Sequence, residues 1–250
     1  MKTLIIRPGG IGDCILCFPA MESLRSEFTE VWVPSAVAPL VQFADAVRCI
    51  AYTGLDVVGL PDRLLPARLC EFDRIVSWYG ANRPEFVEAV RELPFEFHTA
   101  LPAADCTLHA TDFFLTQVGA PPGALPTIHT EPKHAAPTVI HPFSGGRTKN
   151  WPLENFQAVA QQLGDVCWLA GPEEELDGAT RFDSLADVAS CIAGAKFYIG
   201  NDSGITHLAA AVGTPVIAIF GPSDPRIWAP RGLKVHVLLN PSPDDVLRLC

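Results

Sequence analysis

The chain has 250 residues, 48% of them hydrophobic, which can fill one large core or two small ones and excludes a mainly disordered chain. The formal net charge of -10 repels polyanions and argues against a broad interface with the phosphate backbone of nucleic acid. No apolar run reaches the ~20 residues that span a bilayer, and residues 1–4 lead into a strand-like segment rather than a signal peptide. We therefore expect a cytoplasmic protein, in which a small anionic ligand would need a local, specific site.

The first half of the chain alternates short runs rich in Val, Ile and Leu with segments of helical periodicity. The predicted strands are 3–7, 31–34 and 74–78, and the predicted helices are 11–27, 84–92 and 108–118. Buried strands separated by helices are typical of a parallel sheet covered on both faces. Residues 1–125 therefore predict a Rossmann-like, doubly wound α/β domain.

Residues 126–137 are the predicted linker. They belong to a stretch that is rich in proline among small and polar residues and has no hydrophobic periodicity. The alternation then resumes in residues 138–250, which predict a second doubly wound domain. Its expected strands are 138–142, 166–170, 196–200 and 216–220, and its expected helices are 153–163 and 204–212.

The eight cysteines are scattered through hydrophobic segments, so most of them are expected to be reduced core residues. Cys14 and Cys17 have the spacing of a redox motif. They lie in a helix-like stretch without the usual small loop before them, which disfavours a redox role.

In open parallel sheets, ligands bind beyond the carboxyl ends of the strands, where the helices that follow direct their N-terminal N–H groups. Four such loops of the second domain are expected to face one crevice. They are 141–149, 171–173, 201–204 and 221–225.

The loop 201–204 lies between a strand and a small-residue helix, so Asp202, Ser203 and Gly204 stand where an anion would meet the N-terminus of that helix. His207 follows one turn later, where it could donate to a phosphate oxygen. The alternative is an ordinary N-cap at Asp202 or Ser203, with His207 packed in the helix.

The loop after the first strand of the second domain combines Gly145 and Gly146 with Arg147 and Lys149. This combination supplies accessible backbone and positive charge for a departing diphosphate. A solvated loop before the next helix is the alternative.

Glu173, which follows Gly171-Pro172, could accept hydrogen bonds from ribose hydroxyls, or could be a favourable charge in the first turn of a helix. Asp13 ends a Gly-Gly-Ile-Gly-Asp turn between a strand and a helix. Its carboxylate could take a proton from an acceptor hydroxyl across a cleft between the domains, or could cap the helix.

These segments resemble glycosyltransferase family 9, the ADP-heptose:lipopolysaccharide heptosyltransferase family. The resemblance rests on four segments that stand in the family's order. They are the turn ending at Asp13, the stretch 141–152, the turn 171–173, and 201–207 with the downstream Phe-Gly-Pro-Ser-Asp-Pro.

The resemblance implies a GT-B fold, with two Rossmann-like domains facing a central cleft. It also implies an inverting transfer of a sugar from a nucleotide diphosphate, with no metal and no cofactor, and a donor such as ADP-heptose. By the same resemblance Asp13 would be the general base, and Glu173 would hold the ribose. The diphosphate would be held by Ser144, Lys149, Ser203, Gly204 and His207.

The implied partners are the nucleotide-sugar donor and a saccharide or lipid-linked saccharide acceptor, with contact at the inner membrane surface left as an option. Basic residues are sparse in the first domain, where a heavily phosphorylated acceptor would call for a basic patch. Three readings stay open: a heptosyltransferase, a related transferase with another donor or acceptor, and a non-catalytic nucleotide-sugar binder. A sugar-nucleotide epimerase would share the phosphate clamp, but it should show more acid and base residues near the sugar.

Overall fold

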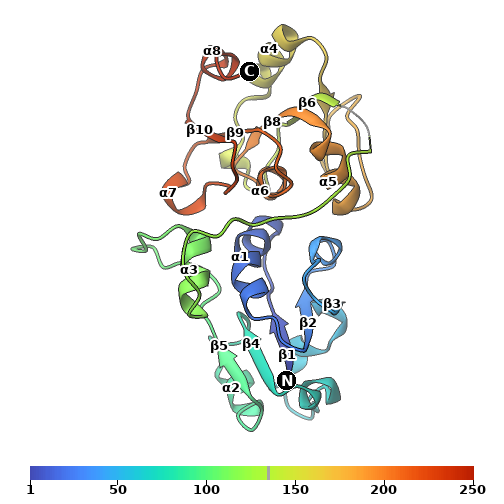
Figure 1. The fold of residues 1–250 in the computed structure, drawn as a ribbon, viewed down its shortest axis with the longest axis vertical. Coiled ribbons are helices and arrows are strands. Elements are labelled where there is room, and N and C mark those ends of the chain that lie inside the picture. The colour runs from blue at the N-terminus through green and yellow to red at the C-terminus, as the bar shows by residue number, and fades with distance from the viewer. Residues whose placement is uncertain (134–135) are drawn as a thin grey trace. The chain divides into compact units, whose positions relative to one another are not determined.

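The computed structural model describes residues 1–133 and 136–250. The chain divides into two compact units (Figure 1). Unit 1 comprises Met1–Cys106 and Ala110–Ala124, and unit 2 comprises Thr107–His109 and Leu125–Cys250. No helix in the described part of the chain is long and apolar enough to cross a membrane.

The sheet of unit 1 has five parallel strands in the order β3-β2-β1-β4-β5. The strands are β1 (Lys2–Ile6), β2 (Phe28–Val33), β3 (Ala46–Cys49), β4 (Arg74–Ser77) and β5 (Phe95–Phe97). This is the strand order of a Rossmann-type half, and the order reverses between β1 and β4. The loop after β1 therefore leaves the sheet at the point where such folds bind ligands.

Both faces of this sheet are covered. On one face lie α1 (Ile11–Ser23) and α3 (Ala110–Gln117), which pack against each other. The other face carries a core that contains Leu4, Ile6 and Trp32. That core is closed by α2 (Pro84–Ala89) and by the short 3-10 turns between β3 and β4, η2 (Ile50–Tyr52), η3 (Leu55–Val57) and η4 (Ala67–Glu71).

The sheet of unit 2 also has five parallel strands, in the order β10-β9-β8-β6-β7. The strands are β6 (Ala136–His141), β7 (Cys167–Trp168), β8 (Ala195–Asn201), β9 (Val216–Phe220) and β10 (Val235–Leu239). Numbered from β6, this is the flavodoxin-like order 2-1-3-4-5, whose ligand crevice lies between the first and third strands. In this chain these strands are β6 and β8.

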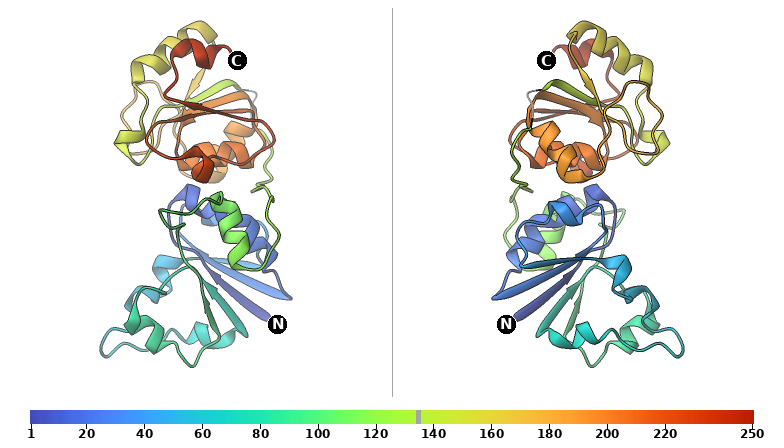
Figure 2. Two further views of the ribbon diagram at one scale, coloured as in Figure 1. Left: turned by 90° about the vertical axis from the view of Figure 1, so that its left-hand side faces the viewer. Right: turned by 90° about the vertical axis from the view of Figure 1, so that its right-hand side faces the viewer.

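Helices cover both faces of this sheet as well (Figure 2). A core that contains Phe156 and Val246 fixes α4 (Leu153–Leu163) and α8 (Pro243–Leu247) on one face. The other face carries α5 (Leu185–Ala193) and α6 (Gly204–Ala211). The short α7 (Pro225–Trp228) follows β9. The prediction of two doubly wound, Rossmann-like domains is confirmed.

The predicted linker 126–137 includes residues 134–135, which lie outside the described residues. Its first part packs on unit 2, because the Ile128 N–H donates to the Ala211 carbonyl at 3.0 Å, and the hydroxyls of Thr130 and Ser190 are 2.8 Å apart. This proline-rich segment therefore follows an ordered path along α5 and α6.

Several predicted boundaries shift in the structure. The helix expected over 11–27 ends at Ser23, because the chain turns through Leu24 and Ser26 to enter β2 at Phe28. The sequence did not predict β3, β5 or β10, nor the helices α5, α7 and α8. By contrast, the predicted ranges 153–163 and 216–220 match α4 and β9 at both ends.

The expectation that most cysteines are core residues is wrong, although all eight are free thiols. Cys14 and Cys17 are buried in α1, Cys70 is exposed, and the other five are half-buried. Most of the cysteines lie where elements meet solvent, at strand ends and in turns. Burial raises the pKa of Cys14 and of Cys17 to about 12, which disfavours the thiolate form of both side chains.

Candidate functional site

The loops that follow β6 and β8 meet at the switch point of the unit 2 sheet. The two strands pair in parallel up to His141 and Gly200, so residues 142–149 and 201–204 leave the sheet side by side. The sequence assigned most of its candidate donor-binding residues to these two loops.

Asn201 joins the two loops. Its side-chain amide donates to the Pro142 carbonyl at 2.7 Å, and its side-chain oxygen accepts from the Trp151 N–H at 2.9 Å. Asn201 is fully buried, so both hydrogen bonds are shielded from water and hold the loop 142–151 at its two ends. The sequence placed Asn201 in the loop but not among the site residues.

Lys149 and Asp202 form an ion pair across the same two loops. Lys149 Nζ lies 2.7 Å from Asp202 Oδ2, and the two side chains are 37% and 6% exposed. The carboxylate is thus nearly buried, while the ammonium group reaches solvent. This arrangement anchors the cation at the carboxyl edge of the sheet and leaves it accessible to a second anion.

Ser203 caps α6. Its hydroxyl accepts from the Thr206 N–H at 3.4 Å and lies 3.2 Å from the Thr206 hydroxyl. Gly204 is the first residue of the helix, and His207 is buried one turn along it. The N-terminal N–H groups of α6 therefore point to the edge where Lys149 lies, a geometry that favours an anion.

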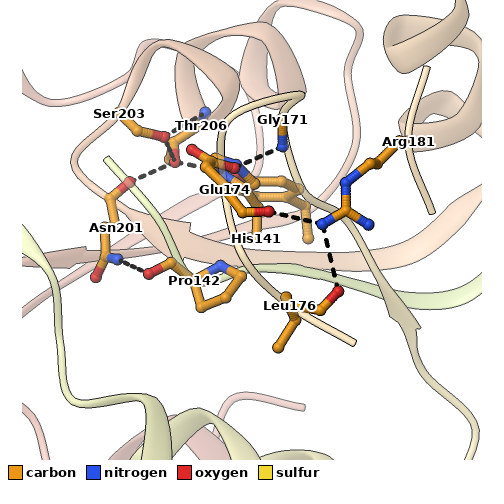
Figure 3. Close-up of polar contacts among 10 residues, drawn as sticks. His141, Pro142, Gly171, Glu174, Leu176, Arg181, Asn201, Ser203 and Thr206 are labelled. Atoms are coloured by element: carbon orange, nitrogen blue, oxygen red, sulfur yellow. Dashed lines mark hydrogen bonds and ion pairs between the residues drawn. The ribbon is translucent and has the colours of Figure 1, made fainter. Parts of the chain in front are cut away.

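Beside this helix, Glu174 links the loop after β7 to the end of β6 (Figure 3). Its Oε2 lies 3.0 Å from His141 Nε2 and accepts from the Gly171 N–H at 2.6 Å. Burial alone would raise the pKa of Glu174, but the hydrogen bonds from His141 and Gly171 hold this pKa below its usual range. Arg181 further fixes the turn by donating to the Glu174 carbonyl at 2.6 Å.

The structure thus distinguishes Glu173, the predicted ribose ligand, from its neighbour Glu174. Glu173 is exposed, whereas Glu174 is half-buried and fixed by hydrogen bonds. His141 is buried, and its Nδ1 has no hydrogen-bond partner among residues 1–133 and 136–250. Sequence reasoning missed His141 and Glu174 as site residues. The available signal was their place near strand ends, since His141 is the last residue of β6 and Glu174 lies in the turn after β7.

The glycine loop is open. An added Cβ at Gly145 would meet no atom within 4 Å, and one at Gly146 would contact the Lys149 side chain at 3.6 Å. Ser144 turns the loop by accepting from the Gly146 N–H at 3.2 Å. A pocket of about 340 Å³ lies against Lys149. It is lined by residues 148–152, 219–222 and Asn240.

In unit 1, the turn from β1 to α1 is fixed by a buried arginine. Arg7 is 1% exposed and donates to the carbonyls of Pro8 and Asp13 at 2.9 and 3.1 Å. Gly9 has a φ of +125°, and a Cβ there would lie 3.3 Å from the Asp13 Cβ. A side chain at Gly9 would therefore be strained and would crowd Asp13.

Asp13 lies in the first turn of α1, where its Oδ2 accepts from the Gly10 N–H at 3.0 Å. Its other oxygen has no hydrogen-bond partner in the described part of the chain, and the side chain is partly exposed. The carboxylate therefore caps the helix and still presents one oxygen. Within the described ranges, no group of three or more His, Cys, Asp or Glu residues is arranged to hold a metal ion.

Comparisons with known proteins agree with these features. Residues 122–245 match the model of glycosyltransferase family 9 (heptosyltransferase). Lipooligosaccharide heptosyltransferase 2 of Haemophilus influenzae is 24% identical, over 95% of this chain and 88% of that protein. Lipopolysaccharide heptosyltransferase 1 of Escherichia coli is 36% identical, but the match covers 37% of this chain and 34% of that protein.

Solved structures show the same fold over the whole chain. The ADP-heptose lipopolysaccharide heptosyltransferase II of E. coli has a TM-score of 0.76 at 17% identity and covers 100% of this chain and 97% of its own. The E. coli heptosyltransferase WaaC, solved with ADP, has a TM-score of 0.68 at 19% identity, with 99% and 98% covered. The two parallel sheets are therefore those of a GT-B fold, and residues 122–245, about half of the chain, match glycosyltransferase family 9.

Proposed function

We propose that the chain is an inverting glycosyltransferase that moves a heptose or a related sugar from an ADP-sugar to a saccharide acceptor, of the lipopolysaccharide type or another. The observation that carries this proposal is the cation at the switch point of unit 2. Lys149 is paired with the nearly buried Asp202 beside the N-terminus of α6. A diphosphate is the ligand that this combination of fixed ammonium and helix N–H groups suits.

In the proposed donor complex, Lys149 and the N–H groups of Ser203 and Gly204 contact the diphosphate. Ser144, Gly145 and Gly146 give the phosphates access to the backbone, since the glycine loop has free space. His207 completes this set from the next turn of α6. These groups would stabilise the negative charge that grows on the leaving ADP, without a metal ion or a cofactor.

We assign proton removal to Asp13. Its free carboxylate oxygen would take the proton of an acceptor hydroxyl, whose oxygen then bonds to the anomeric carbon as the bond to the diphosphate breaks. ADP leaves with the bonding electron pair, and direct displacement inverts the anomeric configuration. Support for this assignment is the position of Asp13 after β1, at the switch point of unit 1.

The ribose would be held by the turn 171–174. The sequence proposed Glu173, and the fixed geometry of Glu174 makes it a second candidate for the same contact. A variant of each residue separates them, because loss of the true ligand should weaken ADP but should not weaken inorganic diphosphate.

The partners follow from this reaction. They are a nucleotide-sugar donor and a saccharide or lipid-linked saccharide acceptor, met in the cytoplasm, and at the inner membrane surface where the acceptor is lipid-linked. These partners are proposals drawn from the relatives' names and from the donor-site geometry.

The first test is calorimetric titration with ADP, UDP, GDP and their sugar conjugates in the presence of EDTA. Selective binding of ADP and ADP-heptose supports the donor assignment, and preference for UDP or GDP replaces the donor. Absence of binding refutes the site. Release of ADP from ADP-heptose only when an acceptor is present then separates a transferase from a non-catalytic binder of the same fold.

A further inference from the structure

A second pocket, of about 320 Å³, lies wholly within unit 1. It lies beside the carboxyl ends of β2 and β3 and is lined by Trp32, Arg48, Cys49, Tyr52, Thr53 and Arg68. Ligands of parallel sheets bind at this edge, and the volume falls in the range of small-molecule sites. None of the proposed donor or catalytic residues lines this pocket.

A buried carboxylate fixes the two arginines of this pocket. Glu30 is fully buried in β2, where its Oε1 accepts from the Arg48 Nε and from the Trp32 indole N–H, each at 2.8 Å. Its Oε2 accepts from Arg68. Burial alone would raise the pKa of Glu30, but the hydrogen bonds from Arg68 and Trp32 and the charge of Arg48 hold this pKa below its usual range.

This arrangement leaves hydrogen-bond donors of Arg48 available to the pocket, whereas Arg68 is paired with both Glu30 and Glu71. The lining contains two arginines and no acidic residue, because Glu30 is covered from solvent. Arg48 uses its Nε for Glu30, and its two terminal nitrogens have no hydrogen-bond partner in the described ranges. Its side chain is 55% exposed, so this pair of donors is free to bind an anion in a fork.

The mouth of the pocket carries an aromatic ring. Tyr52 is 89% exposed, which is unusual for a large aromatic side chain and leaves its face free to stack on a ring. Glu30 and Glu71 balance the charges of the two arginines, so the pocket offers an acid the unpaired donors of Arg48 beside an open aromatic ring.

We propose that this pocket is a binding site for a ligand that carries an acid group, carboxylate or phosphate, on a sugar-sized ring. Arg48 binds the acid group through its two terminal nitrogens, and Tyr52 contacts the ring. Arg68, which is paired with Glu30 and Glu71, forms part of the pocket wall. Glu30 positions both guanidinium groups and does not touch the ligand. The inference stands on unit 1 alone and does not depend on the proposed sugar transfer.

The test is an NMR titration of the full, 15N-labelled chain with glucuronate, glucose 6-phosphate and neutral methyl glucoside. The Trp32 indole N–H, assigned with Trp32→Phe, reports on the pocket directly. Saturable shifts with an acid and none with methyl glucoside support the proposal, and the tighter of the two acids identifies the group that is bound. No saturable shift with either acid, or equal binding of methyl glucoside, overturns it.

Two variants and a matched control sharpen the test. Arg48→Gln should weaken binding by at least about tenfold, the effect expected for loss of a charged hydrogen-bond pair. Arg91→Gln, which removes an exposed arginine on the α2 side of unit 1, should bind like the unchanged protein. Binding within twofold in Arg48→Gln contradicts the proposal.

Tyr52→Ala changes an exposed side chain and should not disturb folding. It therefore tests the pocket even if Arg48→Gln does not fold. It should weaken both acids but leave the response to inorganic phosphate unchanged. Equal affinity of Tyr52→Ala for the sugar acids refutes the proposed ring contact. Calorimetry with ADP on Arg48→Gln should match the unchanged protein, so a failure of the donor site and a failure of this pocket give different results.

Discussion

Replacing Lys149 by methionine should weaken ADP binding by about 10- to 100-fold. Methionine keeps most of the apolar stem and removes the ammonium group, which lies 2.7 Å from Asp202. A hydrogen bond to a charged group contributes about 1.5–3 kcal/mol, and each 1.4 kcal/mol changes a dissociation constant about tenfold. Repulsion of the diphosphate by the unpaired Asp202 adds to this loss, but solvent screens part of it because Lys149 is 37% exposed.

The measurement is calorimetric titration of the variant with ADP, with Lys234→Met as the control. Lys234 is an exposed lysine of unit 2 that precedes β10, so its loss should leave ADP affinity unchanged. In Lys149→Met the buried Asp202 carboxylate loses its partner and faces the diphosphate. The double variant Lys149→Met/Asp202→Asn should therefore recover part of the affinity. ADP affinity within twofold of the unchanged protein in Lys149→Met would refute the assigned role of this cation.

Four further outcomes are expected. Asp13→Asn should abolish sugar transfer with little change in ADP affinity, and wild-type turnover would remove Asp13 as the base. Gly145→Val should keep the melting temperature, since a Cβ there meets nothing within 4 Å, but should weaken ADP in calorimetry; unchanged affinity would place the diphosphate elsewhere. The folded-state pKa of Glu174 is lowered. The stabilisation that Glu174 contributes is therefore complete above its unfolded-state pKa and is lost as the pH falls through its folded-state pKa. Glu174→Gln should flatten the acid side of a plot of melting temperature against pH, and an unchanged slope would contradict this. Gly59→Ala should lower the free energy of unfolding, measured in urea, by at least about 1 kcal/mol. The reason is that φ of Gly59 is +86° and a Cβ there would lie 2.5 Å from the Glu85 carbonyl oxygen. A stability equal to that of the unchanged protein would show that the turn relaxes.

Periodicity predicted the central strands because they are buried along their whole length. β9 is buried at all five positions, and its apolar run, 216–220, was read correctly at both ends. β3 and β10 lie at the edges of their sheets and are half-exposed. Residues such as Arg48 and His236 interrupt their apolar pattern, so these strands depend on pairing with a neighbour that the local sequence does not reveal.

The sequence located the loops of the candidate site but not the contacts within them. Strand ends and glycines are local signals, and they pointed to the segments around Lys149 and Ser203. The pairs Lys149–Asp202 and His141–Glu174 join residues 53 and 33 positions apart. Only the strand order, which places β6 between β8 and β7, brings such residues together, and spacing along the chain does not encode that order.

For Asp13 and Ser203 the sequence left open a choice between helix cap and ligand-binding residue, and the structure shows why the two roles overlap. Each side chain accepts from an N–H at the start of its helix, the N-cap Gly10 for Asp13 and Thr206 for Ser203. N–H groups at helix N-termini are the donors that an anion would use. Removal of the Ser203 hydroxyl would therefore alter the cap and the proposed site together. Asparagine at Asp13 keeps a side-chain oxygen that can accept from Gly10, but it lacks the basicity that proton removal needs. Asp13→Asn is consequently the substitution that separates capping from catalysis at α1.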